Sequence, residues 1–363
     1  MYKHEQMIST MREPPMRVVV TLASLIALAW TPIAAGQAPA VPPPAGCVPA
    51  GNVRYVCGQE APEDLVAVPD SDWVIASVFA GKGGIRLINT RDKTTTVGYP
   101  AAGAKERLDA KTYDSCPGAP DAAEKENFRT HGLAIRAGRN SVHTLYAVHH
   151  GPRESVEVFE VDARAKPPAL TWIGCAVPPD PIGLNEVVAL PDGGFIATDF
   201  LARGIDAVAR GRMLAGENNG ALWEWHTGSG WKMIPGSEAA GANGLEISKD
   251  GKWIYVAAWG SQNFFRLSRG QTPVKRDTVP LGFRVDNIRW APDGSLFAAG
   301  QGGVAPMQTT NIVKINPDTL KVQEILRHPN SPEFGQGTVA LQIGKEIWVG
   351  SFRGDRIAIF PAQ

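Results

Sequence analysis

Residues 243–257 have the sequence Asn-Gly-Leu-Glu-Ile-Ser-Lys-Asp-Gly-Lys-Trp-Ile-Tyr-Val-Ala. Asn243 is followed by alternating apolar and polar residues, a Lys-Asp-Gly turn and a second apolar run. Such alternation around a glycine-containing turn predicts a β-hairpin. We therefore expect two antiparallel strands, with Asn243 at the beginning of the first one.

Five further segments repeat this pattern, two of them in a weaker form. In every copy a polar residue lies seven positions before the turn, and in four copies the turn residue is an aspartate. We call these six the repeat residues: Glu63, His131, Asn185, Asn243, Asp286 and Thr338. Successive turns are about 43 to 68 residues apart, which is typical of four-stranded propeller blades.

Six copies predict an all-β fold, a six-bladed β-propeller that spans residues 51–363. The innermost strand of each propeller blade lines the central channel, so one fixed position in that strand meets its counterparts around the axis. We therefore expect the repeat residues to converge at one end of the channel.

The N-terminal 36 residues have the pattern of a signal peptide. Arg12 and Arg17 precede the apolar run 18–30, which is too short to span a bilayer. Small residues at positions 34 and 36 predict cleavage before Gln37, and residues 37–50 form a proline-rich tether. We expect a secreted or periplasmic protein, with membrane association only if this segment is not cleaved.

The charge pattern excludes one class of partner. The chain contains 36 basic and 36 acidic residues and no long run of either sign. A nucleic-acid-binding surface requires clustered positive charge. We therefore expect no nucleic acid partner and a small molecule as the substrate.

Four cysteines in an exported chain predict two disulfides, with three possible connectivities. Proximity in the sequence favours Cys47 with Cys57. Cys116 and Cys175 lie 15 and 10 residues before two repeat residues, in segments that lead into neighbouring innermost strands. They are the predicted second pair.

Two long segments interrupt the repeats, residues 99–130 and 200–219. The second has Leu201, Ile205 and Val208 at roughly helical spacing, which predicts a short helix. Both segments border the convergent end of the channel. They are interpreted either as walls of a site or as exposed loops.

Four repeat residues, Glu63, Asn185, Asn243 and Asp286, offer only oxygen atoms as ligands, and Asn287 adds a fifth side chain. Hard oxygen ligands in this number favour calcium. Zinc would require histidine or cysteine ligands in a tetrahedral array. The alternative is that these side chains only hydrogen-bond water in the channel.

The repeat residues lie in the motifs Glu63-Asp64-Leu, His131-Gly-Leu, Leu184-Asn185-Glu186-Val-Val-Ala, Ala242-Asn243-Gly-Leu-Glu-Ile-Ser and Val285-Asp286-Asn287-Ile. In this order, from about residue 57 to the C-terminus, they resemble the serum paraoxonase and arylesterase family and, more distantly, the gluconolactonase and regucalcin family. The resemblance implies a six-bladed propeller with two calcium ions. The catalytic ion would be held by Glu63, Asn185, Asn243, Asp286 and Asn287. The structural ion would be held by Asp64, Glu186 and the carbonyl oxygen of Leu133.

The resemblance also implies a catalytic histidine pair, His131 and His150. His131 has the channel position of the calcium ligands without being needed as one, which suits a general base. His149 is the neighbouring candidate for the second histidine. The alternative for both is a structural or orienting role.

The chain departs from the family pattern at two points that bear on its structure. No cysteine follows Cys175, so a disulfide between the first and last strands is impossible. We expect ring closure by strand pairing alone, between residues 52–57 and 356–360. Glu186 stands where the family has an aspartate, and its longer side chain changes the geometry of the structural ion's site.

These features together predict an exported calcium-dependent hydrolase of lactones and related aryl esters. A rival hypothesis is a phosphotriesterase of the diisopropylfluorophosphatase type, in which an aspartate ligand attacks instead of water. A second rival is a non-catalytic binding propeller that calcium stabilises.

Overall fold

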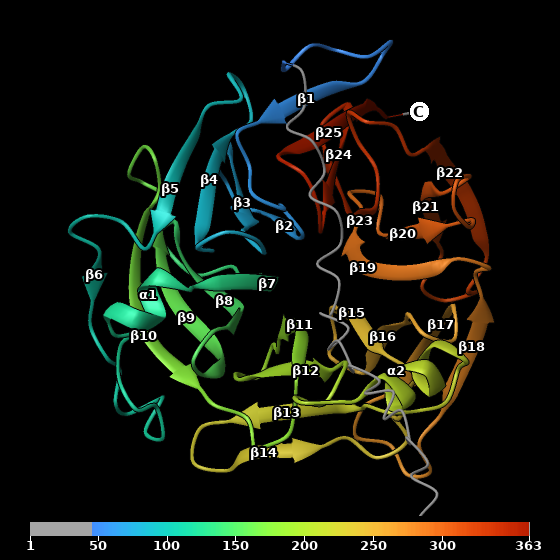
Figure 1. Cartoon of the computed structure of the whole chain (residues 1–363). Helices are drawn as coiled ribbons and strands as arrows, with labels where there is room; N and C mark the ends of the chain where they lie inside the picture. The colour runs from blue at the N-terminus through green and yellow to red at the C-terminus, as the bar shows by residue number, and fades with distance from the viewer. Residues whose placement is uncertain (1–45, 363) are drawn as a thin grey trace, which may run out of the picture. The chain divides into compact units, whose positions relative to one another are not determined.

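Six β-sheets form a ring in residues 46–362, the part of the chain that the computed structural model describes (Figure 1). These residues belong to the unit Pro42–Gln363. The ring confirms the predicted six-bladed β-propeller. The predicted signal peptide, its cleavage site and most of the tether lie outside the described residues.

Each blade contains strands that are mostly consecutive in the chain. The first contains β2 (Leu65–Ala67), β3 (Trp73–Ser77), β4 (Ile85–Asn89) and β5 (Thr95–Tyr99). The second contains β7 (Arg129–Arg136), β8 (Val142–His150), β9 (Glu154–Asp162), β10 (Ala169–Ala176) and the short parallel strand β6 (Lys105–Glu106). The third contains β11 (Leu184–Ala189), β12 (Phe195–Asp199), β13 (Leu222–His226) and β14 (Gly230–Met233).

The fourth blade contains β15 (Ala242–Ile247), β16 (Trp253–Ala258), β17 (Asn263–Ser268) and β18 (Arg276–Pro280). The fifth contains β19 (Arg284–Trp290), β20 (Leu296–Gly302), β21 (Thr309–Ile315) and β22 (Val322–Pro329). The sixth contains β23 (Gly337–Ile343), β24 (Glu346–Ser351), β25 (Arg356–Pro361) and β1 (Arg54–Cys57). The quoted hairpin is thus β15 and β16.

The sixth blade closes the ring by pairing the two ends of the described chain. β1 pairs antiparallel with β25, and Tyr55 lies opposite Ala358 (Figure 1). This is the predicted closure by strand pairing. It ties the N-terminal strand into a sheet whose other strands come from the C-terminus.

The core lies between neighbouring blades, where apolar faces of adjacent sheets pack together. Between the third and fourth blades, for example, Val188 and Ile196 belong to one buried cluster with Leu245 and Val256. Burial of such side chains contributes about 25 cal/mol for each Å² of apolar surface removed from water. The rigid ring that results holds the innermost strands in place.

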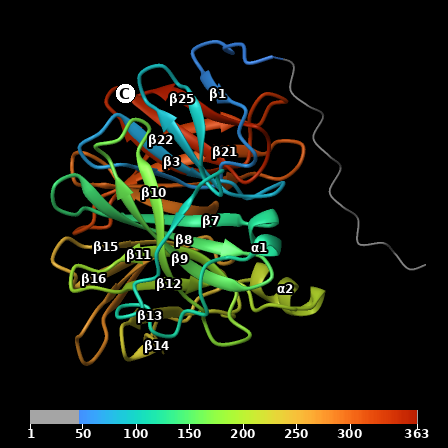
Figure 2. The same ribbon diagram turned by 90° about the vertical axis from the view of Figure 1, so that its left-hand side faces the viewer.

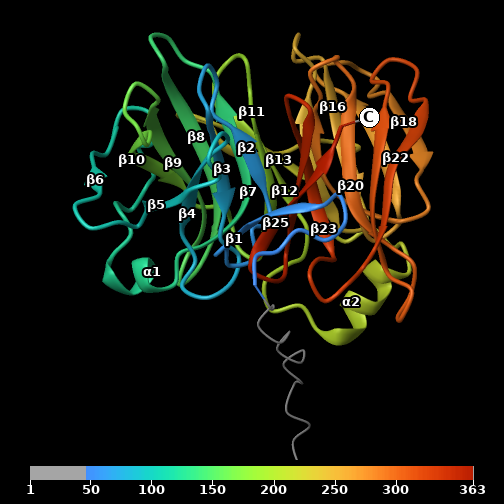
Figure 3. The ribbon, with the colours of Figure 1, turned by 90° about the horizontal axis from the view of Figure 1, so that it is seen from above.

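The two helices lie on the same face of the ring (Figures 2 and 3). α1 (Ala122–Glu126) has a capping box between Asp121 and Glu124 and leads directly into β7. α2 (Ala207–Leu214) begins after the N-cap Asp206 and confirms the predicted helix in segment 200–219. Among the described residues, no helix is both long and apolar enough to cross a membrane.

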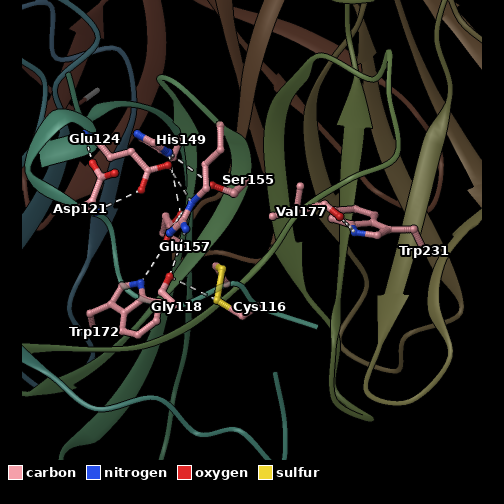
Figure 4. Close-up of a disulfide and its surroundings, with 12 residues drawn as sticks. Cys116, Gly118, Asp121, Glu124, His149, Ser155, Glu157, Trp172, Val177 and Trp231 are labelled. Carbon is pink, nitrogen blue, oxygen red and sulfur yellow. Dashed lines mark hydrogen bonds and ion pairs between the residues drawn. A yellow bond between two sulfur atoms is a disulfide. The ribbon is translucent and has the colours of Figure 1, made fainter. Parts of the chain in front are cut away.

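Both predicted disulfides are present, Cys47–Cys57 and Cys116–Cys175. The second joins the long segment before α1 to β10, beside a buried polar network (Figure 4). In that network Glu157 accepts hydrogen bonds from Trp172 Nε1 at 2.7 Å and from Ser155 Oγ at 2.6 Å. The network and the disulfide fix the second blade, which carries both candidate catalytic histidines.

Candidate active site

Five of the six innermost strands have a break in pairing at the repeat residue. In β11 the pairing passes from Leu184 to Val187, so that Asn185 and Glu186 lie opposite the single residue Thr198. The same shift occurs in β7, β15, β19 and β23. A β-bulge bends its strand and redirects side chains, and such bulges are frequent next to active sites. In each of these five blades, the repeated polar residue therefore coincides with a β-bulge.

Two glycines allow neighbouring innermost strands to approach closely at this level. A Cβ atom at Gly132 would lie 2.5 Å from the backbone oxygen of Asn185. At Gly244 it would lie 2.2 Å from the backbone oxygen of Asp286. Only glycine tolerates such contacts, so these residues permit the close approach of the innermost strands.

The structure brings the repeat residues together at one end of the channel, on the face that carries α1 and α2. Asn287 Nδ2 donates to Glu63 Oε1 at 2.8 Å, and Asn185 Nδ2 lies 3.4 Å from His131 Nε2. Thr338 Oγ1 donates to the Glu63 carbonyl oxygen at 2.5 Å. The five predicted calcium ligands, here called the ligand cluster, are at most 5% exposed: Glu63, Asn185, Asn243, Asp286 and Asn287.

Four oxygen atoms of the ligand cluster are buried and have no hydrogen-bond partner. They are Glu63 Oε2, Asn185 Oδ1, Asn243 Oδ1 and Asn287 Oδ1. Buried polar atoms are normally paired, and an unpaired one costs about 1–3 kcal/mol. Calcium takes six to eight oxygen ligands from carboxylates, amides and water. The donor set therefore fits a calcium ion.

The composition of the ligand cluster differs from that of a zinc site. Within residues 46–362, no group of three or more His, Cys, Asp or Glu side chains could hold a metal ion. Three members of the ligand cluster are asparagines, which fall outside such a group. Amide oxygens are ordinary ligands of calcium but not of zinc.

Burial strongly raises the pKa values of the two carboxyl groups in the ligand cluster. Burial first, and then the charges of Asp286 and Asp64, raise the pKa of Glu63 well above its usual value. Burial raises the pKa of Asp286 to about 7, although Gln301 Nε2 donates to its Oδ2 at 2.6 Å. A cation at this position would favour the ionised form of both groups.

A chain of side-chain hydrogen bonds runs from the ligand cluster through the histidine pair. His131 Nδ1 lies 2.9 Å from His150 Nε2, and His150 Nδ1 lies 2.9 Å from Glu154 Oε2. The other oxygen of Glu154 accepts from the backbone N–H of Leu184 at 2.7 Å. His131 Nε2 points toward the ligand cluster, 3.7 Å from Glu63 Oε2. Burial and then His150 lower the pKa of His131 well below its usual value, which keeps the imidazole neutral at neutral pH.

His149 points away from the channel. It is fully buried, its ring stacks on Phe128 at a centroid distance of 4.4 Å, and its Nδ1 lies 3.3 Å from Ser155 Oγ. Burial lowers its pKa to about 3, so the ring stays neutral. Of the two candidates for the second histidine, only His150 contacts His131.

The residues implied for a second calcium ion do not fit one, because an arginine occupies their centre. Arg289 Nη2 donates to Asp64 Oδ2, to the Leu133 carbonyl oxygen at 3.0 Å and to Glu186 Oε2 at 3.4 Å. We call these four residues the arginine cluster. An ion bound to the same three oxygens would coincide with the guanidinium. The structural ion held by Asp64, Glu186 and Leu133 stays a prediction, and the position of Arg289 argues against it.

Three residues of the site were not predicted: Glu154, Gln301 and Arg289. Glu154 and Gln301 lie on β9 and β20, outside the repeated position, and only the folding of the strands brings their side chains to His150 and Asp286. Arg289 did carry a signal. Positions three residues after the repeat residues are otherwise Val66, Ala134, Val188, Glu246 and Leu341. A charged residue at a mostly apolar channel position indicates a specific partner.

Aromatic side chains follow the second strand of four blades at the end of the channel that holds the ligand cluster. They are Phe79, Phe200, Trp259 and Phe352, and all are partly exposed. Phe79 packs on His131 with ring centroids 4.3 Å apart. Trp259 Nε1 donates to Gln301 Oε1 at 3.0 Å, and Gln301 in turn holds Asp286. The ligand cluster therefore has an apolar rim.

Comparison with known proteins supports the fold. No family model and no curated protein matches the chain. A luciferin-regenerating enzyme is 16% identical, with 85% of this chain and 94% of that chain covered and a TM-score of 0.54. The calcium-binding protein regucalcin from Agrobacterium tumefaciens is 12% identical, with 88% and 96% covered and a TM-score of 0.53.

Solved structures that share the fold thus include regucalcin and a luciferin-regenerating enzyme. At these identities the likeness establishes the fold alone, and the chain is a six-bladed β-propeller. The resemblance to the paraoxonase family stays a prediction.

Proposed function

We propose that this protein is a calcium-dependent hydrolase of lactones and related aryl esters. The observation that carries the proposal is the set of four unpaired buried oxygens beside His131 Nε2, whose hydrogen bond to Asn185 Nδ2 is long at 3.4 Å. A cation site and a neutral imidazole at the end of one channel are the two elements that metal-assisted ester hydrolysis requires.

The mechanism follows from the hydrogen-bond chain. A calcium ion bound by the ligand cluster would polarise the substrate carbonyl and stabilise the negative charge that develops on its oxygen. Glu154 accepts the Nδ1 proton of His150, so His150 Nε2 accepts the Nδ1 proton of His131. This tautomer leaves His131 Nε2 unprotonated, with its lone pair directed toward Asn185 Nδ2 at 3.4 Å and the ligand cluster.

His131 Nε2 then removes a proton from water while the water oxygen attacks the carbonyl carbon. The bond to the leaving oxygen breaks, and His131 returns the proton to that oxygen. A lactone gives a hydroxy acid, and an aryl ester gives a carboxylic acid and a phenol. General-base catalysis of this kind contributes about 10²- to 10⁴-fold in rate.

The apolar rim favours substrates with an aliphatic or aromatic part. Phe79 and Trp259 present partly exposed rings beside the histidine pair and Asp286. An acyl chain or aryl group that packs on these rings would keep its carbonyl near His131. Rings of this kind contribute through burial of apolar area rather than through charge.

Export is part of the proposal. Two disulfides are typical of proteins that fold in an oxidising compartment. The predicted signal peptide adds to this, although it lies outside the described residues. We propose that the protein acts in the periplasm or outside the cell.

A hydrolysis screen tests the proposed function. Aliphatic lactones, aryl esters and phosphotriesters are incubated with the protein in calcium, and again after chelation. We expect lactone and aryl ester hydrolysis that is lost with the chelator and restored by calcium. Hydrolysis that survives chelation would contradict the proposal, and preferred cleavage of phosphotriesters with a covalent label on Asp286 would support the phosphotriesterase hypothesis.

A further inference from the structure

The arginine cluster pairs two buried carboxylates with a cation that the protein itself supplies. Asp64 and Glu186 are fully buried, and their carboxylates lie 2.7–2.9 Å from the backbone N–H groups of Leu65, Leu133 and Val187. Two carboxylates at this depth need a counter-charge, because the cost of removing an ion from water is several kcal/mol. The guanidinium of Arg289 is the cation that lies between them.

Every nitrogen of the Arg289 guanidinium has a partner in the channel wall. Nε donates to the Leu65 carbonyl oxygen at 3.2 Å, and Nη1 donates to the Ile288 carbonyl oxygen at 2.8 Å. Nη2 donates to the three groups that the resemblance would give to a metal. Burial opposes the positive charge, but four nearby carboxylates together outweigh burial and raise the pKa of Arg289: Asp64, Glu186, Glu246 and Glu63.

We propose that Arg289 is a built-in replacement for a second cation, so that this propeller binds one calcium ion in its channel rather than two. Calcium–oxygen bonds are 2.3–2.6 Å long, and an ion at that distance from Asp64 Oδ2, Glu186 Oε2 and the Leu133 oxygen would overlap Nη2. The two cations exclude each other. The arginine cluster is therefore stable without calcium, and only the ligand cluster responds to it.

The channel beyond Arg289 has room for the water that a calcium ion would need in place of the guanidinium. A cavity of about 380 Å³ adjoins Arg289 and is lined by the later residues of the innermost strands, among them Val66, Ala134 and Ile247. Removal of the long side chain would leave three oxygen ligands facing open space that water can enter. Water could then complete the six to eight ligands of calcium.

The test is the number of calcium ions per chain, measured by equilibrium dialysis, in the wild type and in Arg289→Ala. We expect the variant to bind one more ion than the wild type. Its melting temperature should fall by roughly 5 to 15 °C in chelator and recover in calcium, because an unpaired buried charge is costly and the ion restores the pairing. Arg356→Ala is the matched control, since Arg356, the first residue of β25, is also buried but pairs with the preceding residue Asp355.

The inference rests on the proposed function only for the calcium ion that the ligand cluster binds. If the ligand cluster bound no calcium, the wild type would bind no ion and Arg289→Ala would bind one. The expected difference of one ion would remain. Equal counts, or two ions in the wild type, would overturn the replacement role.

A second variant, Arg289→Gln, retains hydrogen-bond donors and is less disruptive. It should also gain one ion. If neither variant folds in excess calcium, the ion cannot take the place of the guanidinium and the inference is wrong.

Discussion

The ligand cluster and the arginine cluster lie next to each other in the same channel and are built from residues that are adjacent in the sequence. Glu63 and Asn185 belong to the first, and Asp64 and Glu186 to the second. In the ligand cluster four oxygens are buried without partners, whereas in the arginine cluster Arg289 pairs with both carboxylates. Burial alone therefore does not mark a binding site. The unpaired oxygens do.

The largest expected effect comes from removing a member of the ligand cluster. Asn243→Ala and Asp286→Ala should each lower kcat/KM at least about 10³-fold, because charge stabilisation by a metal is worth several kcal/mol and each 1.4 kcal/mol is a factor of ten. Thermal melting should show that both variants remain folded. Asn311→Ala is the control, since Asn311 is buried on β21 outside the bulges.

Retained activity in these variants would mean that the ligand cluster takes no part in catalysis. If the soluble fraction kept full specific activity and only the yield of folded protein fell, the cluster would be structural. The non-catalytic binding propeller would then be the better hypothesis.

His131→Gln should lower the rate about 10²- to 10⁴-fold, because glutamine cannot accept the proton. The wild-type rate should rise with pH along a limb below about 6.5, since a base acts only when deprotonated and burial lowers the pKa of His131. A calcium ion nearby would lower the pKa of His131 further. The pH–rate profile checks this, and calcium affinity should change little. A variant with the same limb would remove His131 from the mechanism.

Glu154→Gln should have a smaller effect on rate, roughly 10- to 100-fold, because this residue acts through His150. Loss of its negative charge should move the pH limb of activity to lower pH, since a carboxylate favours the protonated imidazole. Glu160→Gln, on the same strand but paired with Arg107 at the surface, is the control. An unshifted limb would mean that Glu154 only packs against His150.

These side chains differ in how far the sequence predicted them. The repeat residues recur at the same phase of the blades, so a spacing of seven residues before the turn located Glu63 and Asp286 without any structure. Glu154 could not be found in this way, because its contact depends on the pairing of β8 with β9, where it lies opposite His150. Such register is a property of the folded hairpin and leaves no periodic signal.

Arg289 bears on how far the resemblance can be followed. The motifs indicate where cation ligands lie, but they do not indicate which cation is present. Arg289 lies three residues after Asp286, outside the motif that carries the likeness. A basic residue at a channel position that is apolar in four other blades was the available sign of an internal counter-charge.

Variants of the arginine cluster should have the smallest effect on turnover. Asp64→Asn removes one carboxylate from Arg289, which should lower the free energy of unfolding by up to about 3–5 kcal/mol because a buried pair is broken. Specific activity of the folded fraction should change less than about threefold, since Asp64 does not face His131. Urea unfolding and active-site titration check the two parts. A loss of activity as large as that of Asp286→Ala would mean that both clusters take part in catalysis.

The most direct test of the account is a crystal structure of the protein grown with calcium. We predict a peak of anomalous scattering within 2.3–2.6 Å of Glu63 Oε2, Asn185 Oδ1, Asn243 Oδ1 and Asn287 Oδ1, with Arg289 still paired to Asp64. Only water at those four oxygens, or a peak beside Asp64 with Arg289 displaced, would contradict the account.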